Sequence, residues 1–434
     1  MVLAIGMMIR PCTMLLQGSI QNLHAIEQHC ARATSHSSLS PSTILLSTSI
    51  QCFEGIRAAK LRDKWMEFQG IKNWEGLLDP LDDDLRHEIL RYGQFVDAAY
   101  RSFDFDTSSP TYATCRYPKV SMLTQCGLGT SGYKVTKNLH AMCSIQVPRW
   151  IERIPNWTST KSNWIGYVAI CDNEEEIIRL GRRDVVISYR GTATCHEWLE
   201  NFRVTLTFLP NDMAPENCVP MVQSGFLSLY TSSTESHPSL QQMVKEEIEQ
   251  ILQKYCDEPL SITITGHSLG AALATITAYD ITNTFSHAPL VTVVSFGGPR
   301  VGDKTFRNQL EKNGAKVLRI VNSDDLITKV PGFVIDDNDV AKKGAVHVAT
   351  RRLPTWLQKR VEDTQWVYAE IGKELRLSSR DCPHLSKRDV ATCHDLKTYL
   401  HLVNNFVSST CGFRATAKGV LKRTNQDKET ALIT

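Results

Sequence analysis

Short β-branched runs alternate with longer segments of helical spacing along most of this chain. The strand candidates are rich in valine and isoleucine and lie at 164–171, 185–190, 261–265, 291–296 and 317–321. Apolar residues recur at helical intervals in the segments 85–103, 239–255, 271–279 and 397–406. This alternation favours an α/β fold with βαβ units and a mostly parallel central sheet, whose functional side chains gather at the carboxyl ends of the strands.

The strand at 261–265 is the most informative because it feeds the sequence Gly-His-Ser-Leu-Gly at 266–270. A helix of small residues follows directly at 271–275. A strand, a sharp turn and a helix are the context of a nucleophile elbow, in which the flanking glycines leave room for a serine with a strained backbone. Ser268 is therefore the candidate nucleophile.

A serine hydroxyl needs a histidine that takes its proton and an acid that orients this histidine. In chains with such an elbow, the acid and then the histidine follow the serine in sequence. Asp325 follows an apolar strand by a few residues and is the best acid, although spacing alone separates it poorly from Asp324. His394 opens a helical segment from a loop and is the best base, with His401 further into that helix and His347 as a rival.

The tetrahedral intermediate of acyl transfer needs hydrogen-bond donors aimed at its oxyanion. One predicted donor is the backbone N–H of Leu269, the residue after the nucleophile. The other is expected in the loop after an earlier strand, where Gly191 lets the backbone approach and Thr192 offers both an N–H and a hydroxyl. Arg190, which precedes them, is expected to be a structural ion-pair residue.

Composition narrows the classes of function. The chain has 434 residues, 42% of them hydrophobic, which suffices for a large core in one or two domains. Its 48 basic and 46 acidic side chains leave a net charge of +2 and argue against a nucleic-acid partner. No apolar run approaches the ~20 residues of a membrane span. The thirteen cysteines contain no C-x-x-C pair, which indicates free, mostly buried thiols in a reducing compartment. Because the chain also lacks a zinc-binding cysteine pattern, we predict neither a metal nor a cofactor.

The first 55 residues differ in composition from the rest. Their acidic residues are Glu27 and Glu54 alone, and ten of the sixteen residues at 34–49 are serine or threonine. This acid-poor, hydroxyl-rich composition is typical of an organelle transit peptide, and the scarcity of basic residues favours a chloroplast over a mitochondrion. The alternative is an ordinary tail on a cytosolic protein. The sequence thus predicts a disordered leader at 1–55, a folded catalytic unit at 56–413 and a basic polar tail at 414–434.

Six spaced blocks resemble those of class 3 lipases, and the chain is similar to the plastidial phospholipase A(1) enzymes of plants within that family. The blocks are Tyr-Arg-Gly-Thr at 189–192, Gly-Phe-Leu at 225–227, the elbow, Ser-Phe-Gly-Gly-Pro-Arg-Val-Gly at 295–302, Val-Asn-x-x-Asp at 321–325 and Cys-His-Asp-Leu at 393–396. The segment 73–81 resembles the start of the plant subgroup, so the resemblance covers about residues 65–413. It implies an α/β-hydrolase fold with Ser268 as nucleophile, Asp325 as acid, His394 as base, and Thr192 and Leu269 as oxyanion hole.

The resemblance also implies a substrate. It points to a serine acyl hydrolase that releases the sn-1 fatty acid of glycerophospholipids such as phosphatidylcholine at a membrane surface. Galactolipids and triacylglycerols are the further substrates that it implies, and the released fatty acid is expected to enter oxylipin (jasmonate) synthesis. It favours a lid at 193–202 whose Trp198, Leu199 and Phe202 contact lipid, where a buried helix is the other interpretation. One position departs from the family pattern: Gln223 stands before the sequence Ser-Gly-Phe, where many relatives have a histidine. The alternative functions are a non-catalytic lipase-like scaffold and an esterase or thioesterase of another class.

Overall fold

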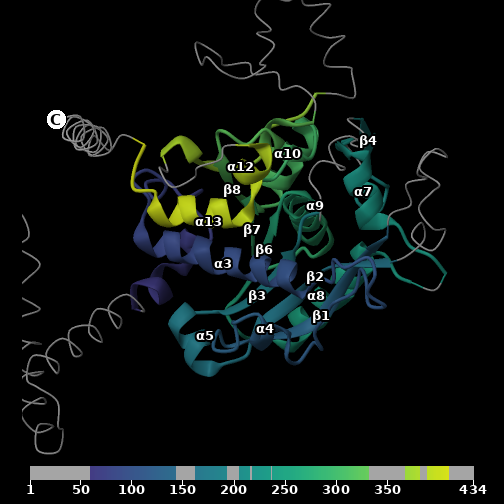
Figure 1. Cartoon of the computed structure of the whole chain (residues 1–434), viewed down its shortest axis with the longest axis horizontal. Coiled ribbons are helices and arrows are strands. Elements are labelled where there is room, and N and C mark those ends of the chain that lie inside the picture. The colour runs from purple at the N-terminus through teal and green to yellow at the C-terminus, as the bar shows by residue number, and fades with distance from the viewer. Residues whose placement is uncertain are drawn as a thin grey trace, which may run out of the picture. The chain divides into compact units, whose positions relative to one another are not determined.

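A central sheet organises the computed structural model, which describes residues 59–142, 162–192, 205–215, 218–235, 237–331, 367–381 and 389–409. Within these ranges seven strands form the sheet, in the spatial order β1 (Tyr133–Met142), β2 (Ser162–Cys171), β3 (Arg183–Tyr189), β6 (Leu260–His267), β7 (Leu290–Phe296), β8 (Lys316–Asn322) and β9 (Lys373–Leu377). Figure 1 labels the strands of this sheet from β1 to β8. The β1–β2 and β2–β3 pairs are antiparallel, and the pairs from β3 to β9 are parallel. This topology confirms the predicted mostly parallel sheet of an α/β-hydrolase fold. A separate two-stranded sheet consists of β4 (Leu206–Phe208) and β5 (Met221–Gln223).

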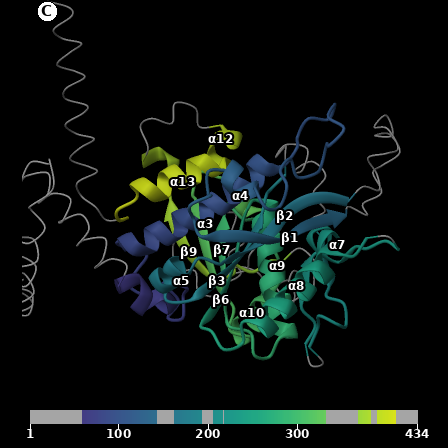
Figure 2. The ribbon, with the colours of Figure 1, turned by 90° about the horizontal axis from the view of Figure 1, so that it is seen from below.

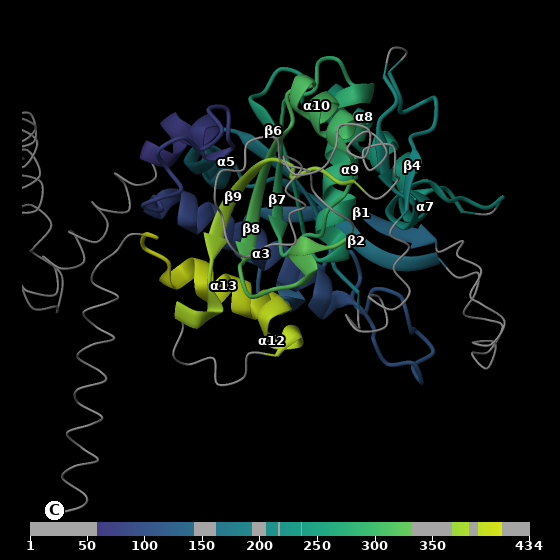
Figure 3. The ribbon, with the colours of Figure 1, turned by 90° about the horizontal axis from the view of Figure 1, so that it is seen from above.

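Helices cover both faces of the central sheet (Figures 2 and 3). One face carries α3 (Asp83–Ser102) and α13 (Leu396–Asn405), and the other carries α8 (Leu240–Lys254), α9 (Leu269–Thr284) and α10 (Lys304–Lys312). Shorter helices are α4 (Met122–Gln125), α5 (Glu174–Leu180), α7 (Ser224–Thr231) and α12 (Val390–His394). Each face has its own hydrophobic core, as a sheet that is buried on both sides requires.

The alternation of side chains along β6 shows how one strand serves both cores. Ile262 and Ile264 belong to the core beneath α8 and α9. Ser261 and Thr263 point to the opposite face, where the Thr263 hydroxyl lies 3.1 Å from the Tyr92 hydroxyl of α3. Successive side chains of a strand face opposite sides. The predicted Ser-Ile-Thr-Ile-Thr run therefore presents an apolar surface to α9 and a polar one to α3.

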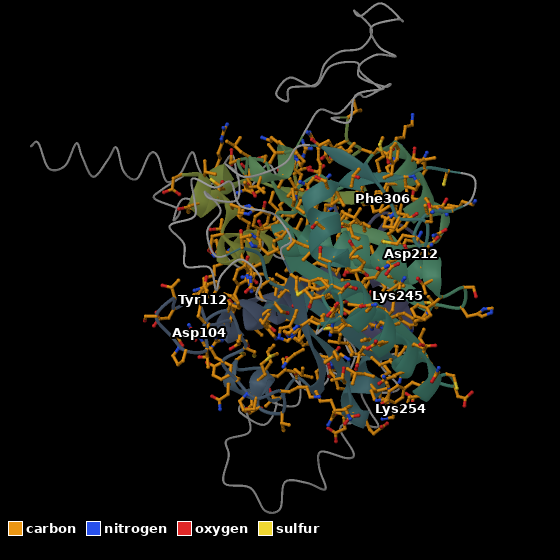
Figure 4. All side chains as sticks on the ribbon, turned by 90° about the vertical axis from the view of Figure 1, so that its right-hand side faces the viewer. Asp104, Tyr112, Asp212, Lys245, Lys254 and Phe306 are labelled. Carbon is orange, nitrogen blue, oxygen red and sulfur yellow. The ribbon has the colours of Figure 1, made fainter. Side chains whose placement is uncertain are left out.

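A polar contact and a ring stack join the helices α8, α9 and α10, whose residues Lys245 and Phe306 are labelled in Figure 4. Lys245 of α8 reaches the buried Asp280 of α9 with an Nζ–Oδ1 distance of 3.0 Å. Phe306 of α10 stacks on Tyr279 of α9 with ring centroids 4.7 Å apart. The three helices are thus joined into one layer by packing and by a charged pair.

All the strands and helices that the hydrophobic pattern predicts are present, but the pattern missed both edge strands. β1 contains Lys134, Lys137 and Asn138, and β9 reads Lys-Glu-Leu-Arg-Leu. An edge strand has a neighbour on one side only and tolerates charged residues that hide the β-branched signature. The predicted leader at 1–55 and tail at 414–434 lie outside the described residues and stay predictions.

The described cysteines agree with the expectation of free thiols. Six of them lie in the described ranges, all unbridged. Cys126, Cys171 and Cys393 are buried, but Cys115 and Cys218 are partly exposed and Cys256 is exposed, so only half of the six are buried. None of the helices in the described part of the chain combines the length and the apolar character that a membrane span needs.

Candidate active site

Ser268 occupies the sharp turn between β6 and α9. Its backbone has φ 59° and ψ −124°, and a positive φ is rare for a residue with a side chain. The Ser268 N–H donates to the Phe296 carbonyl of β7 at 3.0 Å and holds the turn against the sheet. A Cβ on Gly270 would lie 2.6 Å from the carbonyl oxygens of Tyr189 and Arg190, so glycine is needed for α9 to approach β3 this closely. The elbow that the motif predicts is therefore formed.

A buried imidazole and carboxylate form a direct pair at the ends of β8 and α12. His394 Nδ1 lies 2.7 Å from Asp325 Oδ2, and both side chains are buried. A carboxylate only accepts hydrogen bonds, so Nδ1 carries the proton and Nε2 is the basic nitrogen of the neutral ring. Asp325 also accepts from the Tyr399 hydroxyl at 2.7 Å and from the Ile327 N–H at 2.9 Å. Three donors thus fix the carboxylate that orients His394.

The two neighbouring acids have different partners. Asp324 accepts hydrogen bonds from the hydroxyls of Ser378 and Ser379, at 3.1 and 3.0 Å, and pairs with Arg380 at 2.9 Å. These contacts fasten the loop after β9 to the loop after β8. Asp325 alone of the two contacts the imidazole, which is the distinction that spacing could not make.

The main chain around His394 is held from two directions. The Asn322 side-chain amide donates to the Cys393 carbonyl at 2.9 Å, and His267 Nε2 lies 2.6 Å from the His394 carbonyl. His267 directly precedes Ser268, so this contact brings the histidine segment against the elbow. His401 is an exposed residue of α13, and the rival His347 lies outside the described residues.

The predicted oxyanion loop lies beside the elbow. A Cβ on Gly191 would contact the Tyr100 hydroxyl and lie 3.1 Å from the Ser268 Cβ, so the glycine backbone packs directly on the serine. The buried guanidinium of Arg190 donates to the carbonyls of Gly191 at 2.7 Å and Trp164 at 3.0 Å, and these contacts shape the loop. The structure therefore gives Arg190 a structural role, but among the described residues its hydrogen-bond partners are carbonyl groups and not the acid that the sequence predicted. Within the described ranges, the buried Thr192 hydroxyl has no hydrogen-bond partner. Leu269 is the first residue of α9, where an N–H has no acceptor within the helix.

Three side chains at this site were not predicted to have a role there. Tyr100 fits the apolar spacing of α3, Tyr399 fits that of α13, and His267 is the variable position of the elbow motif. The only available signal for His267 is its place beside the nucleophile. Gln223, the departure from many relatives, caps α7 by accepting from the Phe226 N–H at 2.7 Å. The predicted lid residues Trp198, Leu199 and Phe202 lie outside the described residues.

A strained serine, a basic imidazole nitrogen and a carboxylate on an α/β-hydrolase fold define a class of protein, the carboxylic ester hydrolases of the serine type. A family model described as lipase (class 3) matches residues 186–335. The chain is 64% identical over 369 residues to the chloroplastic phospholipase A(1) DAD1 of Arabidopsis thaliana, which covers 84% of this chain and 81% of that protein. The chain belongs to the class 3 lipase family, as the sequence motifs indicate.

Two further proteins are similar to this chain. The chloroplastic galactolipase DONGLE of Arabidopsis thaliana is 39% identical over 356 residues, covering 78% of this chain and 69% of that protein. Among solved structures, a lipase from Rhizopus microsporus var. chinensis is similar to this chain with a TM-score of 0.39 and 20% identity, covering 58% of this chain and 71% of that one.

Proposed function

We propose that Ser268, His394 and Asp325 are the catalytic triad of this hydrolase. The observation that carries the proposal is the buried 2.7 Å contact between His394 Nδ1 and Asp325 Oδ2 beside the strained elbow. His394 Nε2 takes the hydroxyl proton while Ser268 attacks the ester carbonyl, and then gives that proton to the leaving alcohol. A water molecule, deprotonated by the same nitrogen, cleaves the acyl-enzyme and restores the serine. Asp325 stabilises the imidazolium in both steps.

Thr192 and Leu269 supply the donors for the oxyanion in this proposal. The developing negative charge needs donors that are already in place, because a preorganised donor requires no reorientation as the reaction proceeds. The Thr192 hydroxyl, which has no hydrogen-bond partner among the described residues, and the N–H groups at the start of α9 supply such donors. The positive end of the helix dipole adds to their effect on the oxyanion.

The substrate in this proposal is the sn-1 ester of glycerophospholipids at a membrane surface. Relatives named phospholipase A(1) and galactolipase support it, and galactolipids and triacylglycerols are further candidates. The released fatty acid would then serve oxylipin synthesis. Lipid contact by Trp198, Leu199 and Phe202 stays a prediction from the sequence.

Residues 1–55 are proposed as a plastid leader. The support is their hydroxyl-rich, acid-poor composition and the chloroplastic names of two relatives. A fluorescent protein fused behind residues 1–55 is expected to accumulate in chloroplasts. Accumulation in mitochondria or the cytosol would contradict the assignment.

The test of the activity uses liposomes of phosphatidylcholine with different acyl chains at sn-1 and sn-2. The full-length protein is expected to release the sn-1 acid first, and Ser268→Ala is expected to abolish release while the circular dichroism spectrum stays the same. Ser131→Ala, in the loop before β1, is the matched control and should keep full activity. Hydrolysis by Ser268→Ala would refute the triad, and predominant sn-2 release would refute the position on the lipid.

A soluble p-nitrophenyl ester separates the alternative functions. A lipase is expected to hydrolyse aggregated lipid faster than a short soluble ester. Faster turnover of the soluble ester would favour an esterase of another class, and no turnover of either substrate would favour a scaffold.

A further inference from the structure

His267 connects α3 to the segment that carries the proposed catalytic base. Its Nδ1 lies 2.8 Å from the Tyr100 hydroxyl, and its Nε2 lies 2.6 Å from the His394 carbonyl oxygen. The two histidine rings are 4.7 Å apart between centroids. His267 is thus in contact with groups from α3 and α12 while it stands next to Ser268 in the chain.

The protonation of His267 follows from its partners. A carbonyl oxygen only accepts, so Nε2 must carry the hydrogen that is donated to His394. Burial and the neighbouring His394 lower the pKa of His267 well below its ordinary value, so the ring is neutral and Nδ1 has no hydrogen. Nδ1 therefore accepts, and the Tyr100 hydroxyl is its donor. One tautomer of His267 satisfies both contacts.

Tyr100 is fixed in turn by the oxyanion loop. Its hydroxyl sits where a Cβ on Gly191 would be, so any larger residue at 191 would displace it. The Tyr100 and His267 rings lie 5.8 Å apart between centroids. The contacts of this one tyrosine thus reach the loop with Thr192, the elbow with Ser268 and, through His267, the histidine segment.

We propose that His267 is a positioning residue that sets the distance between Ser268 and His394, with Tyr100 selecting the tautomer that can do so. The proposal rests on the proposed triad. Asp325 orients the His394 ring through Nδ1, but it leaves the main chain of that residue to be fixed by other contacts. The N–H donated by His267 supplies one of them, from the residue adjacent to the nucleophile.

The neutrality of His267 also matters for the chemistry. When His394 takes the serine proton it becomes an imidazolium, and a second charged ring 4.7 Å away would oppose that step. A neutral His267 avoids this repulsion and keeps its single N–H on the His394 carbonyl. The same ring thus positions the base and leaves its basicity intact.

Two amide variants test which contact matters. In His267→Gln the side-chain nitrogen is as many bonds from Cα as Nε2 and is able to donate to the His394 carbonyl. In His267→Asn the amide is as many bonds from Cα as Nδ1, so it reaches the Tyr100 hydroxyl and not that carbonyl. We expect kcat on p-nitrophenyl butyrate to fall about fivefold in His267→Gln, because the amide does not fully restore the geometry of the imidazole. In His267→Asn the contact with the His394 carbonyl is lost, and kcat should fall about 100-fold, the loss that a displacement of a catalytic group by about 1 Å causes.

KM is expected to stay within about twofold in both variants, since no contact with the ester is altered. His140→Gln on β1 is the control for the substitution itself and should match the wild type. Tyr100→Phe removes the donor to Nδ1 while keeping the ring, and its kcat is expected to fall about tenfold. Tyr100→Phe also tests the proposal in the case that the variants at position 267 do not fold.

Equal kcat values for the glutamine and asparagine variants, or wild-type kcat in Tyr100→Phe, would overturn the positioning role. A loss seen as raised KM would do the same, because a positioning residue changes turnover. Failure of the triad itself has a different signature. In that case the wild type does not hydrolyse the ester, or Ser268→Ala still does.

Discussion

Helix α3 joins two buried polar networks at opposite ends of strand β6, and they differ in charge. At the start of the strand lies an ionic cluster of two acids and two arginines: Glu88, Arg91, Arg182 and Asp184. At its end, Tyr100 of the same helix reaches the active site. In the cluster the formal charges of the four residues cancel, whereas at the active site the Asp325 carboxylate faces a histidine ring and a tyrosine hydroxyl.

The two networks also differ in how completely their hydrogen bonds are made. In the cluster, both oxygens of Glu88 accept from Arg91, at 3.0 and 2.6 Å, and both oxygens of Asp184 accept from hydroxyls of β1, β6 and α3. At the active site the backbone of Ser268 is strained, and in the described ranges the Thr192 hydroxyl has no partner. Of the two ends of β6, the active-site end therefore has the strained backbone and the open hydrogen-bonding capacity, and the saturated end of α3 stabilises the fold.

Asp325→Asn is the change with the largest expected effect on the reactive network. An amide in place of the carboxylate no longer stabilises the imidazolium and favours the wrong tautomer of His394, so kcat on a soluble ester should fall about 10³- to 10⁴-fold. Turnover of p-nitrophenyl butyrate by the purified full-length chain measures the loss.

The neighbouring acid supplies the matched control for this change. Asp324→Asn alters a carboxylate of the same turn that contacts Ser378, Ser379 and Arg380, and its kcat should remain within about threefold of the wild type. A loss of similar size in both variants would mean that the turn as a whole matters, and not the contact between Asp325 and His394.

The sequence predicts the parts of this site that depend on local spacing. The strand, turn and helix around Ser268 are encoded within a short segment, and the glycine at 270 is needed where α9 approaches β3. The β-branched runs likewise predict the inner strands, because these are buried on both faces. Such features require no knowledge of distant contacts.

Other parts depend on contacts between distant segments and cannot be predicted from local spacing; Asp325 in particular is selected by the family resemblance. The choice between Asp324 and Asp325 is made by residues more than fifty positions further along, since Ser379 contacts one carboxylate and His394 the other. Tyr100 has the spacing of a core residue of α3, and its hydroxyl gains a role only because α3 lies along β6. Hydrophobic periodicity identifies the buried face of a helix, but it does not show which partner the polar end of a buried side chain contacts.

Glu88→Gln is the second largest change and acts on stability. Burial alone would raise the pKa of Glu88, but the attraction of Arg91 and Arg182 outweighs it and lowers this pKa to about 2. The stability linked to this shift is present above about pH 4.5 and is lost as the pH falls towards 2. The substitution should therefore lower the free energy of unfolding by about 3 kcal/mol at pH 7, as removal of one partner of a buried pair does.

Urea unfolding measures this loss, and Glu175→Gln on the exposed surface of α5 is the control, expected within about 0.5 kcal/mol of the wild type. The kcat of Glu88→Gln should equal that of the wild type while the protein is folded. A large fall in kcat would show that the two ends of α3 are coupled, which would weaken the contrast between the networks.

Tyr399→Phe should have a smaller effect, confined to the reactive network. Its hydroxyl donates to Asp325 Oδ2 at 2.7 Å, and burial raises the pKa of Tyr399 well above its ordinary value, so the group stays a donor. Loss of one hydrogen bond to a charged group should lower kcat about 10- to 100-fold with little change in KM. Tyr279→Phe, whose hydroxyl contacts the Met213 carbonyl on the other face, should keep wild-type kcat. Equal kcat values for both variants would show that Asp325 is oriented without Tyr399.

The smallest predicted effect concerns the pH dependence of stability at His267. The folded protein keeps this ring neutral because its pKa is lowered by burial, whereas the unfolded chain takes up a proton below about pH 6.5. The unfolded state then binds more protons than the folded one, so the free energy of unfolding falls as the pH is lowered, by about 1 kcal/mol at about pH 5.5 from this group. His267→Gln does not titrate, and its free energy of unfolding should therefore decline less steeply between about pH 7 and 5.5 than that of the wild type. If the free energy of unfolding fell equally steeply with pH in both proteins, His267 would be protonated in the folded state as well. Both ring nitrogens would then carry hydrogen, and the neutral tautomer that links Tyr100 to His394 would not be present.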